Sequence, residues 1–426
     1  MIALIITVFT IGYLCIMFEH AIKINKAASA LITGILCWTV YILHSPDKEI
    51  VGEQLAHHLG ELSGILFFLL GAMTIVELTD LFNGFDIITA RITQTNKLKL
   101  LWIISFITFF LSAVLDNLTT TIVMLSLLSK LIKDSKDRLF FAGMIVIAAN
   151  AGGAWSPIGD ISTAMLWIGG QITSLNIVIS CFFPSLVCLI APLVYMSFRM
   201  KGNVERPAEN INTDDKQISK GQQYVIFFSS VLVLIMVPFF KTVTHLPPYM
   251  GMLLGLSILW IITEIIRRTE NGKEKDALSV SYALRKIDAP SVLFFLGILL
   301  SIAALESTGM LKQLSGWLSA TISNEKIIVV VIGLLSAVID NVPLVAAAQG
   351  MYTLQQYPTD HFFWEFMAFC TGTGGSALII GSAAGVVAMG MQKISFFWYL
   401  KKIALLALLG YFAGIVVFLL QHYLFS

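Results

Sequence analysis

The chain has 426 residues, of which 57% are hydrophobic and 12% are charged, and its formal net charge is +1. A soluble domain carries about 25% charged residues, so this composition excludes a soluble protein and indicates an all-α integral membrane protein with many spans. No polar stretch is long enough to bury a core of its own, and the function is therefore expected within the membrane.

Ten apolar tracts are predicted to cross the bilayer. In chain order they are residues 2–19, 27–45, 61–79, 140–170, 175–198, 222–240, 249–266, 289–306, 362–391 and 396–421. The first lacks the positive region and the small-residue cleavage site of a secretory signal, so it is expected to be a retained span. The polar stretch 199–221 is expected to be a cytoplasmic linker between a first half, 1–198, and a second half, 222–426.

Two further apolar tracts, 98–131 and 327–352, share a motif at their midpoints. The first reads SAVLDN from Ser112, and the second reads SAVIDN from Ser336. Either tract fits one long tilted helix or a re-entrant hairpin that returns on the side from which it entered. Lys and Arg residues flank both ends of the first tract, so the positive-inside rule favours a hairpin that starts and ends in the cytoplasm.

The same rule orients the whole chain. It places all but four of the 27 Lys and Arg residues in the cytoplasm, and the exceptions are Lys48, Lys241, Lys312 and Lys326. The second tract then becomes a hairpin that enters from outside, opposite the first. We predict a multi-pass protein of the cell (inner) membrane with both chain termini outside.

The two halves also share a longer order of motifs. LFFLLGAMTIVELTDLF from Leu66 resembles LFFLGILLSIAALESTGML from Leu293, and each is followed by its SAV(L/I)DN motif and then by a Gly-rich tract. Each half then holds five spans and one hairpin, and an odd number of spans turns the second copy upside down. This order predicts an inverted repeat, which places the binding site of a transporter near the midplane.

The aspartates at the tips of the two predicted hairpins indicate a functional site. An ionised Asp at the bilayer centre costs roughly 2.5–3.5 kcal/mol, so Asp116 and Asp340 need compensating partners. Helix capping is one explanation, because Asp accepts hydrogen bonds from free N–H groups at a helix start. A Ser, Thr or Asn would cap at a lower desolvation cost, which favours a site for a cation or proton.

Two Gly-rich tracts are predicted to interrupt membrane helices. They read AANAGGAWSPIGDIST from Ala148 and CTGTGGSALIIGSAAG from Cys370. Interruptions free backbone carbonyls and helix ends, which can coordinate a small cation. Close packing of small residues is the alternative, but packing does not require Asp160, whose counterpart in the second tract is Ser382.

The predicted cation and proton site combines the acids with nearby amides and hydroxyls. Its members are Asp116, Asn117, Thr119, Thr120, Asn150, Ser156, Asp160, Asp340, Asn341, Thr373 and Ser376. The accessory candidates are Ser112, Ser336, Glu77, Glu306 and Ser382. Because hard oxygen ligands dominate and no Lys or Arg is expected at the midplane, the site favours sodium, lithium or a proton over an anion. Glu77 and Glu306 either shape access to the site or are ordinary interfacial carboxylates.

Three motifs together, LSAVLDN, NAGGAWSPIGDISTAMLW and SAVIDN, resemble those of the NhaD-type sodium/proton antiporters, in the ion transporter superfamily that includes arsenite permeases. The similarity extends from FEHAIKINKAASALI at Phe18 through the last Gly-rich tract. The resemblance implies a homodimer in which a scaffold supports a mobile region of two hairpins and two interrupted helices that moves like an elevator. It also implies functional roles, including sodium binding, for Asp116, Asp160 and Asp340.

The predicted function is the exchange of sodium or lithium for protons across the membrane by alternating access, which would serve pH homeostasis. Sodium and protons are expected to compete for the three aspartates, and neither a cofactor nor a nucleic acid is expected. An arsenite or other small-solute permease is the alternative, although a neutral substrate would not need three acids. A channel is a weaker alternative because opposed hairpins favour alternating access, and no motif supports an enzyme.

Overall fold

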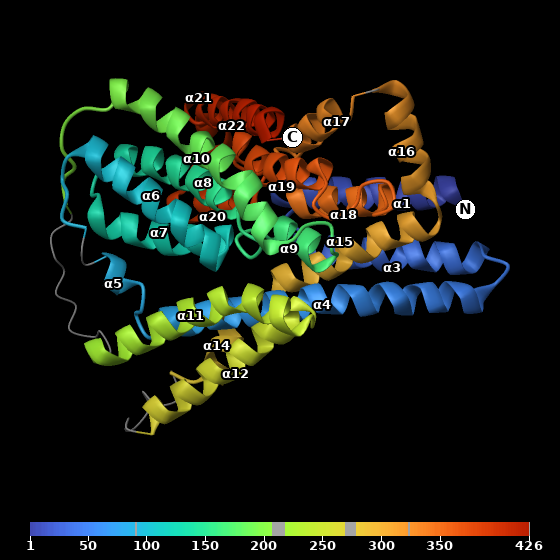
Figure 1. Ribbon diagram of the computed structural model, residues 1–426, viewed down its shortest axis with the longest axis horizontal. Coiled ribbons are helices and arrows are strands. Elements are labelled where there is room, and N and C mark those ends of the chain that lie inside the picture. The colour runs from blue at the N-terminus through green and yellow to red at the C-terminus, as the bar shows by residue number, and fades with distance from the viewer. Residues whose placement is uncertain (90–91, 207–217, 269–277, 323, 426) are drawn as a thin grey trace.

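The computed structural model describes residues 1–89, 92–206, 218–268, 278–322 and 324–425, and every regular element within these ranges is a helix (Figure 1). Eight of the described helices are long and apolar enough to cross a membrane. They are α3 (Lys26–His44), α4 (Lys48–Leu81), α6 (Lys97–Leu115), α10 (Ser174–Arg199), α11 (Lys220–Thr244), α12 (Pro248–Arg267), α15 (Ala289–Ser307) and α22 (Ala404–Phe425). The prediction of an all-helical polytopic membrane protein is confirmed.

The other described helices are shorter than these spans or, like α8, less apolar. They are α1 (Ile2–Met17), α2 (Glu19–Ile22), α5 (Asp86–Thr89), α7 (Asn117–Leu131), α8 (Ser135–Gly153), α9 (Ile161–Ile168), α14 (Val280–Lys286), α16 (Met310–Thr321), α17 (Glu325–Leu335), α18 (Asn341–Met351), α19 (Phe362–Gly374), the 3-10 turn η1 (Gly375–Ala377), α20 (Ala383–Gln392) and α21 (Phe396–Lys402). The predicted spans 140–170 and 362–391 fall in this set because each consists of two shorter helices.

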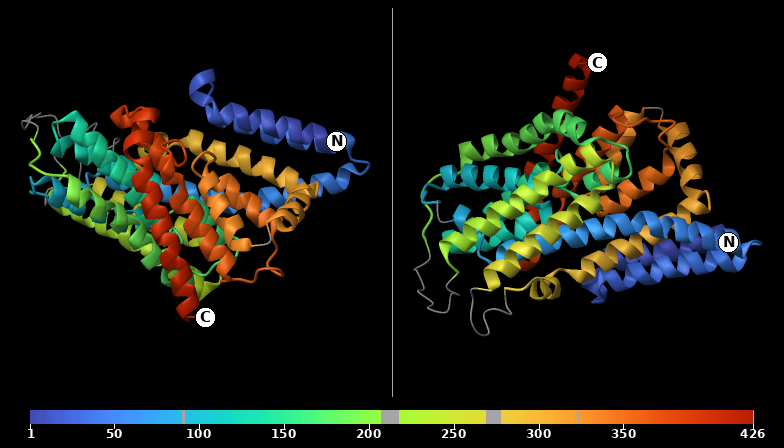
Figure 2. Two further views of the ribbon diagram at one scale, coloured as in Figure 1. Left: turned by 90° about the horizontal axis from the view of Figure 1, so that it is seen from above. Right: turned by 60° about the horizontal axis from the view of Figure 1, so that its bottom comes forward.

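The helices form two groups, which Figures 1 and 2 show from three directions. The first helix group contains α1, α3, α4, α11, α12, α14 and α15, with its most extensive contacts between α3 and α15. The second helix group contains α6–α10 and α17–α22, with its most extensive contacts between α10 and α22. Contacts between the groups are made mainly by α15 with α18 and by α4 with α9.

Some helices begin or end at residues other than those predicted. One reason is that a capping residue fixes where the helix starts. Helix α4 begins at Lys48, well before the predicted span 61–79. The Asp47 carboxylate accepts hydrogen bonds from two backbone N–H groups of the first turn at 3.0 and 3.2 Å, and this caps the helix start. Hydropathy locates the apolar part of a helix, whereas the cap determines its first residue. The predicted span 396–421 is divided at Ile403, between α21 and α22.

Both SAV(L/I)DN motifs lie at helix boundaries. Helix α6 ends at Leu115 and α7 begins at Asn117, so Asp116 alone separates these two helices, which also contact each other. In the second motif α17 ends at Leu335 and α18 begins at Asn341. Each tract is therefore a pair of helices that meet near an aspartate, and neither is one long helix.

The Gly-rich tracts interrupt helices as predicted. Helix α8 ends at Gly153 and the chain becomes helical again at Ile161, where α9 begins. Helix α19 ends at Gly374, and α20 begins at Ala383 after the single turn η1. The segments between them leave backbone groups outside the helical hydrogen-bond ladder, which is the arrangement that an ion site needs.

The two halves make corresponding contacts at corresponding residues. The Ser112 hydroxyl donates a hydrogen bond to the carbonyl oxygen of Ala149 at 2.6 Å, and the Ser336 hydroxyl donates to that of Thr371 at 2.8 Å. Each bond ties a helix pair to the helix that precedes an interruption. Both serines therefore hold the backbone together, and such matched contacts are what a repeated architecture would produce.

Two glycines mark close backbone approaches at the same places. A Cβ on Gly152 would lie 2.2 Å from the carbonyl oxygen of Phe109, and one on Gly374 would lie 1.9 Å from that of Gly333. Because backbone yields less readily than a flexible side chain, we expect Gly152→Ala and Gly374→Ala each to lower the free energy of unfolding by about 1–3 kcal/mol or more. Thermal unfolding of the purified protein in detergent measures the loss.

Gly60→Ala and Gly316→Ala are the matched controls, because both glycines are helical and a Cβ on either would meet nothing within 4 Å. There Ala should be neutral or stabilise the helix by up to about 1 kcal/mol. Equal destabilisation by all four substitutions would contradict close backbone approach as the cause.

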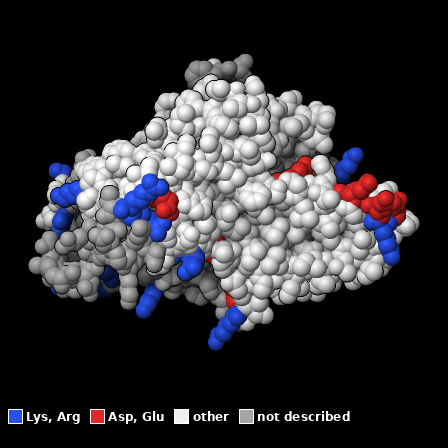
Figure 3. Space-filling model, turned by 90° about the horizontal axis from the view of Figure 1, so that it is seen from below, with Lys and Arg blue, Asp and Glu red and all other residues white. Residues whose placement is uncertain are grey.

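The two ends of the molecule carry different charges. On the face drawn in Figure 3, Lys and Arg gather at the left end and most Asp and Glu at the right end. The left end is also where α6 and α11 begin and α10 ends, whereas α3 and α4 are joined at the right end (Figure 1). The predicted linker 199–221 lies at the basic end, although its residues 207–217 are outside the described residues.

Candidate functional site

Asp160 lies at the centre of buried polar residues. It directly precedes α9 and is 2% exposed. Its Oδ1 accepts a hydrogen bond from Asn117 Nδ2 at 3.3 Å, and its Oδ2 accepts hydrogen bonds from Asn341 Nδ2 and Ser162 Oγ, each at 2.7 Å. The donors belong to α7, α18 and α9, so one carboxylate joins both helix pairs to the first interruption. These three donors stabilise its negative charge away from water.

Asn150 extends this network to the second interruption. Its side chain is fully buried in α8, where its Oδ1 accepts a hydrogen bond from Asn117 Nδ2 at 3.1 Å. Its Nδ2 donates to the hydroxyls of Ser376 and Ser382, each at 2.9 Å. We name the connected residues the polar cluster. It consists of Asn117, Asn150, Asp160, Ser162, Asn341, Ser376 and Ser382.

Asp116 lies beside the polar cluster in a strained backbone conformation. Its φ of 83° and ψ of 160° fall in a region normally occupied by glycine, at a cost of about 1–3 kcal/mol. Its carboxylate caps α7 by accepting hydrogen bonds from the backbone N–H and the hydroxyl of Thr119 at 2.7 and 2.9 Å. Capping alone does not require this strain, because Asp340 caps α18 at a φ of −48°. The strain therefore points to a functional constraint at Asp116.

A small cavity adjoins Asp116 and Asp160. Its volume is about 30 Å³, and its remaining walls are largely apolar side chains of α4 and α15, including Phe68 and Phe295. None of the described residues that line it is Lys or Arg. A water molecule needs roughly 10–15 Å³, so there is room for about two small species. A dehydrated cation, a water molecule or a protonated carboxyl group fits here.

Asp340 stays outside the polar cluster. Its carboxylate accepts a hydrogen bond from the backbone N–H of Val342 at 3.2 Å, and the positive charge of Lys26 in α3 acts on it. Among the described residues, no three His, Cys, Asp or Glu side chains are grouped where they could hold one metal ion. The three-aspartate sodium site remains a prediction, in which Asp116 and Asp160 share a cavity and Asp340 caps its own helix.

The other predicted polar residues have different roles. The Ser156 hydroxyl donates to the carbonyl oxygen of Ala113 at 2.6 Å and holds the first interruption against α6. The Thr373 hydroxyl donates to the carbonyl oxygen of Phe369 within its own helix at 2.6 Å. The Thr120 hydroxyl is buried and has no hydrogen-bond partner among the described residues. Each of the three hydroxyl oxygens keeps a lone pair, but none of these residues lines the cavity beside Asp116 and Asp160.

The two accessory glutamates lie apart from the polar cluster. Glu77 forms an ion pair with Lys286 at 3.7 Å, which fits an interfacial carboxylate. Glu306 lines a groove of about 730 Å³ together with His58 of α4 and Gln349 of α18. This groove lies where the two helix groups meet, so Glu306 keeps its candidate role in access.

Two contacts of the polar cluster were not predicted from the sequence. Ser162 bonds to Asp160, and the signal available for it was a hydroxyl two residues after the acid in GDIST. The Tyr399 hydroxyl of α21 donates to the carbonyl oxygen of Ser376 at 2.8 Å. Nothing in the sequence around Tyr399 signals this contact, because it depends on how α21 packs.

The helical membrane fold and the charged residue buried at its centre define a polytopic membrane transport protein. A family model described as citrate transporter matches residues 2–365. The chain belongs to this transporter family. Because the family and its named relatives are transporters, the prediction that the chain is not an enzyme is confirmed.

Relatives of the chain carry the names of ion exchangers. Sodium/proton antiporters 1 and 2 of Arabidopsis thaliana are 48% and 46% identical over 97% of this chain, covering 71% and 98% of their own lengths. The Na(+)/H(+) antiporter NhaD of Alkalimonas amylolytica is 31% identical over 97% of this chain and 89% of its own length. The predicted resemblance to NhaD-type antiporters is confirmed.

Proposed function

We propose that this protein exchanges sodium for protons across the membrane as a secondary active transporter. The observation that carries the proposal is the cavity between two carboxylates, Asp116 and Asp160, which has room for a small cation and no cationic side chain among its described lining residues. Hard oxygen ligands of this kind suit sodium. The names of the relatives support the same pair of ions.

In the proposed cycle sodium and a proton compete for Asp116 and Asp160. Two nearby carboxylates disfavour simultaneous ionisation, so one of them holds a proton until a cation enters the cavity. Asp340 acts on Asp160 through its charge rather than as a shared ligand.

Alternating access is proposed to occur by an elevator-like movement of the second helix group against the first. All residues of the polar cluster belong to the second group, whereas one wall of the cavity beside it belongs to α4 and α15 of the first group. A cross-link between Phe68→Cys and Ala164→Cys, which face the same cavity from the two groups, should stop exchange until it is reduced. Exchange that continues in the cross-linked protein would contradict this movement.

Citrate and arsenite are the competing substrates. Citrate carries several negative charges and needs cationic partners, and pockets for organic ligands measure about 300–1,000 Å³. The cavity of about 30 Å³ with two carboxylates meets neither requirement. Neutral arsenite would not need two carboxylates that face one cavity.

Everted membrane vesicles test the proposed exchange. After protons have been accumulated inside the vesicles, sodium added outside should dissipate this gradient, because each sodium ion that enters is exchanged for protons that leave. Lithium is proposed as a second transported cation and should act in the same way. A leak that does not depend on sodium would indicate a channel, and citrate or arsenite uptake without a sodium response would overturn the proposal.

The proposed orientation places the basic end of the molecule in the cytoplasm and both termini outside the cell membrane. In a Cys15→Ser background, Lys48→Cys and Gln356→Cys should react with an impermeant thiol reagent added to intact cells, whereas Lys220→Cys should react only in everted vesicles. The reverse labelling pattern would contradict the proposed topology.

Homodimer formation is also part of the proposal and rests on the family resemblance alone. The mass of the protein in detergent-free nanodiscs measures its oligomeric state.

A further inference from the structure

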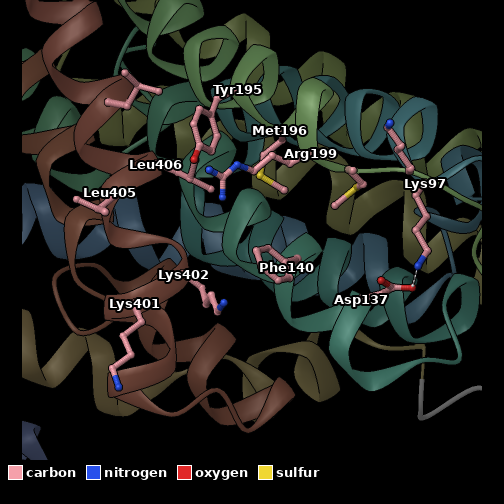
Figure 4. A pocket seen from close by; sticks show the side chains of 13 residues that line it. Lys97, Asp137, Phe140, Tyr195, Met196, Arg199, Lys401, Lys402, Leu405 and Leu406 are labelled. Carbon is pink, nitrogen blue, oxygen red and sulfur yellow. Dashed lines mark ion pairs between the residues drawn. The ribbon is translucent and has the colours of Figure 1, made fainter.

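The basic end of the molecule holds a groove that the proposed exchange does not use. Its volume is about 700 Å³, and it lies where α10 and α21–α22 approach the start of α6 (Figure 4). Arg199 and Lys201 line it from the end of α10 and the residues after it, and Lys401 and Lys402 line it from the end of α21. Four positive charges from two separate segments therefore meet at one groove.

Acidic residues of the protein neutralise little of the charge of these four side chains. The one acidic residue of the groove, Asp137, is already paired with Lys97 at 2.7 Å. Within the described part of the chain, no ion pair involves Arg199, Lys201, Lys401 or Lys402. The Arg199 guanidinium instead lies 4.9 Å from the ring centroid of Tyr195.

Helix ends reduce this positive potential only in part. Helices α10 and α21 end at the groove, and each C-terminus carries about half a negative charge. Helix α6 begins at Lys97 beside the same groove, and its N-terminus adds about half a positive charge. The net potential stays positive and favours an anion.

The other wall of the groove is apolar and faces outward from the helices. Leu405, Leu409 and Tyr195 are 73%, 43% and 39% exposed, and they lie on the membrane-spanning helices α22 and α10. The backbone beneath the cations is held in place, because the Lys97 N–H donates to the carbonyl oxygen of Gly202 at 3.0 Å. The groove thus combines basic side chains on a fixed backbone with an exposed apolar wall. This combination suits an amphipathic anion.

We propose that this groove binds one anionic phospholipid, with its phosphodiester headgroup at Arg199 and Lys402 and its acyl chains along Leu405 and Leu409. Basic grooves between membrane helices at the cytoplasmic side suit such headgroups. A soluble phosphate compound would use the cations but gain nothing from the apolar wall. The bound lipid joins α10 to α21 and α22 within the second helix group.

Native mass spectrometry of the full chain, released from detergent with phosphatidylglycerol or phosphatidylcholine, tests the proposal. The protein should retain phosphatidylglycerol in preference to phosphatidylcholine. Each Arg or Lys near an anionic lipid surface changes affinity about fivefold, so Arg199→Gln with Lys402→Gln should weaken binding about 25-fold. Each single substitution should weaken binding about fivefold, and Arg199→Lys should retain most of it.

Lys220→Gln with Arg285→Gln is the matched control, because both residues are exposed and lie outside the groove. This control should bind phosphatidylglycerol as the wild-type protein does. Equal retention of the two lipids, or equal loss in the groove variant and the control, would overturn the proposal. Displacement of the lipid by millimolar glycerol phosphate would assign the groove to a soluble phosphate compound instead.

Discussion

Replacing Asp160 with asparagine is expected to abolish sodium-dependent proton movement, with a loss of about a hundredfold or more. A hydrogen bond to a charged group contributes about 1.5–3 kcal/mol, and Asp160 accepts three. The substitution removes the charge and turns an amide N–H₂ toward donors from Asn117, Asn341 or Ser162. Initial rates of proton movement in everted vesicles, measured against sodium concentration, quantify the loss.

Two further variants accompany this test, one with a smaller expected loss and one as a control. Ser162→Ala removes one of the three donors and should weaken sodium dependence by about tenfold, since one bond to a charged group is lost. Asp47→Asn is a matched control because Asp47 caps α4 far from the polar cluster, and asparagine caps equally well. Near-normal exchange by Asp160→Asn, with the protein folded, would exclude Asp160 from the ion site.

Asp116→Asn should likewise stop exchange, whereas Asp340→Asn should lower it at most about fivefold. Asparagine preserves the helix cap at both positions and tolerates a positive φ, so neither variant should unfold. Asp116 faces the cavity shared with Asp160, whereas Asp340 caps α18 and does not line that cavity.

The comparison of these two variants is internally controlled, because both change an aspartate in the same SAV(L/I)DN motif. Vesicle assays from about pH 6 to 9.5 cover the range in which buried carboxylates can titrate. Equal losses from both substitutions would show that the two helix pairs contribute equally to the site. That result would support the three-aspartate site expected from the sequence.

The sequence by itself determined the membrane class, most spans and the main candidate acids. Long apolar tracts are local signals, since each span needs about 20 apolar residues whatever surrounds it. Polar residues inside such tracts are equally conspicuous, because an unpaired polar group is costly there. Asn117, Asn150, Asp160 and Asn341 were predictable for this reason, and the Gly-rich tracts predicted both interruptions.

Only the tertiary structure decided which of these residues meet. Asn117, Asp160 and Asn341 are far apart in the chain, and their hydrogen bonds exist because α7, α9 and α18 pack around one point. The near-identical motifs around Asp116 and Asp340 gave no sign that one backbone would be strained and the other relaxed. Packing against different neighbours decides that difference, because a local sequence specifies its own preferences but not the surroundings that hold it against them.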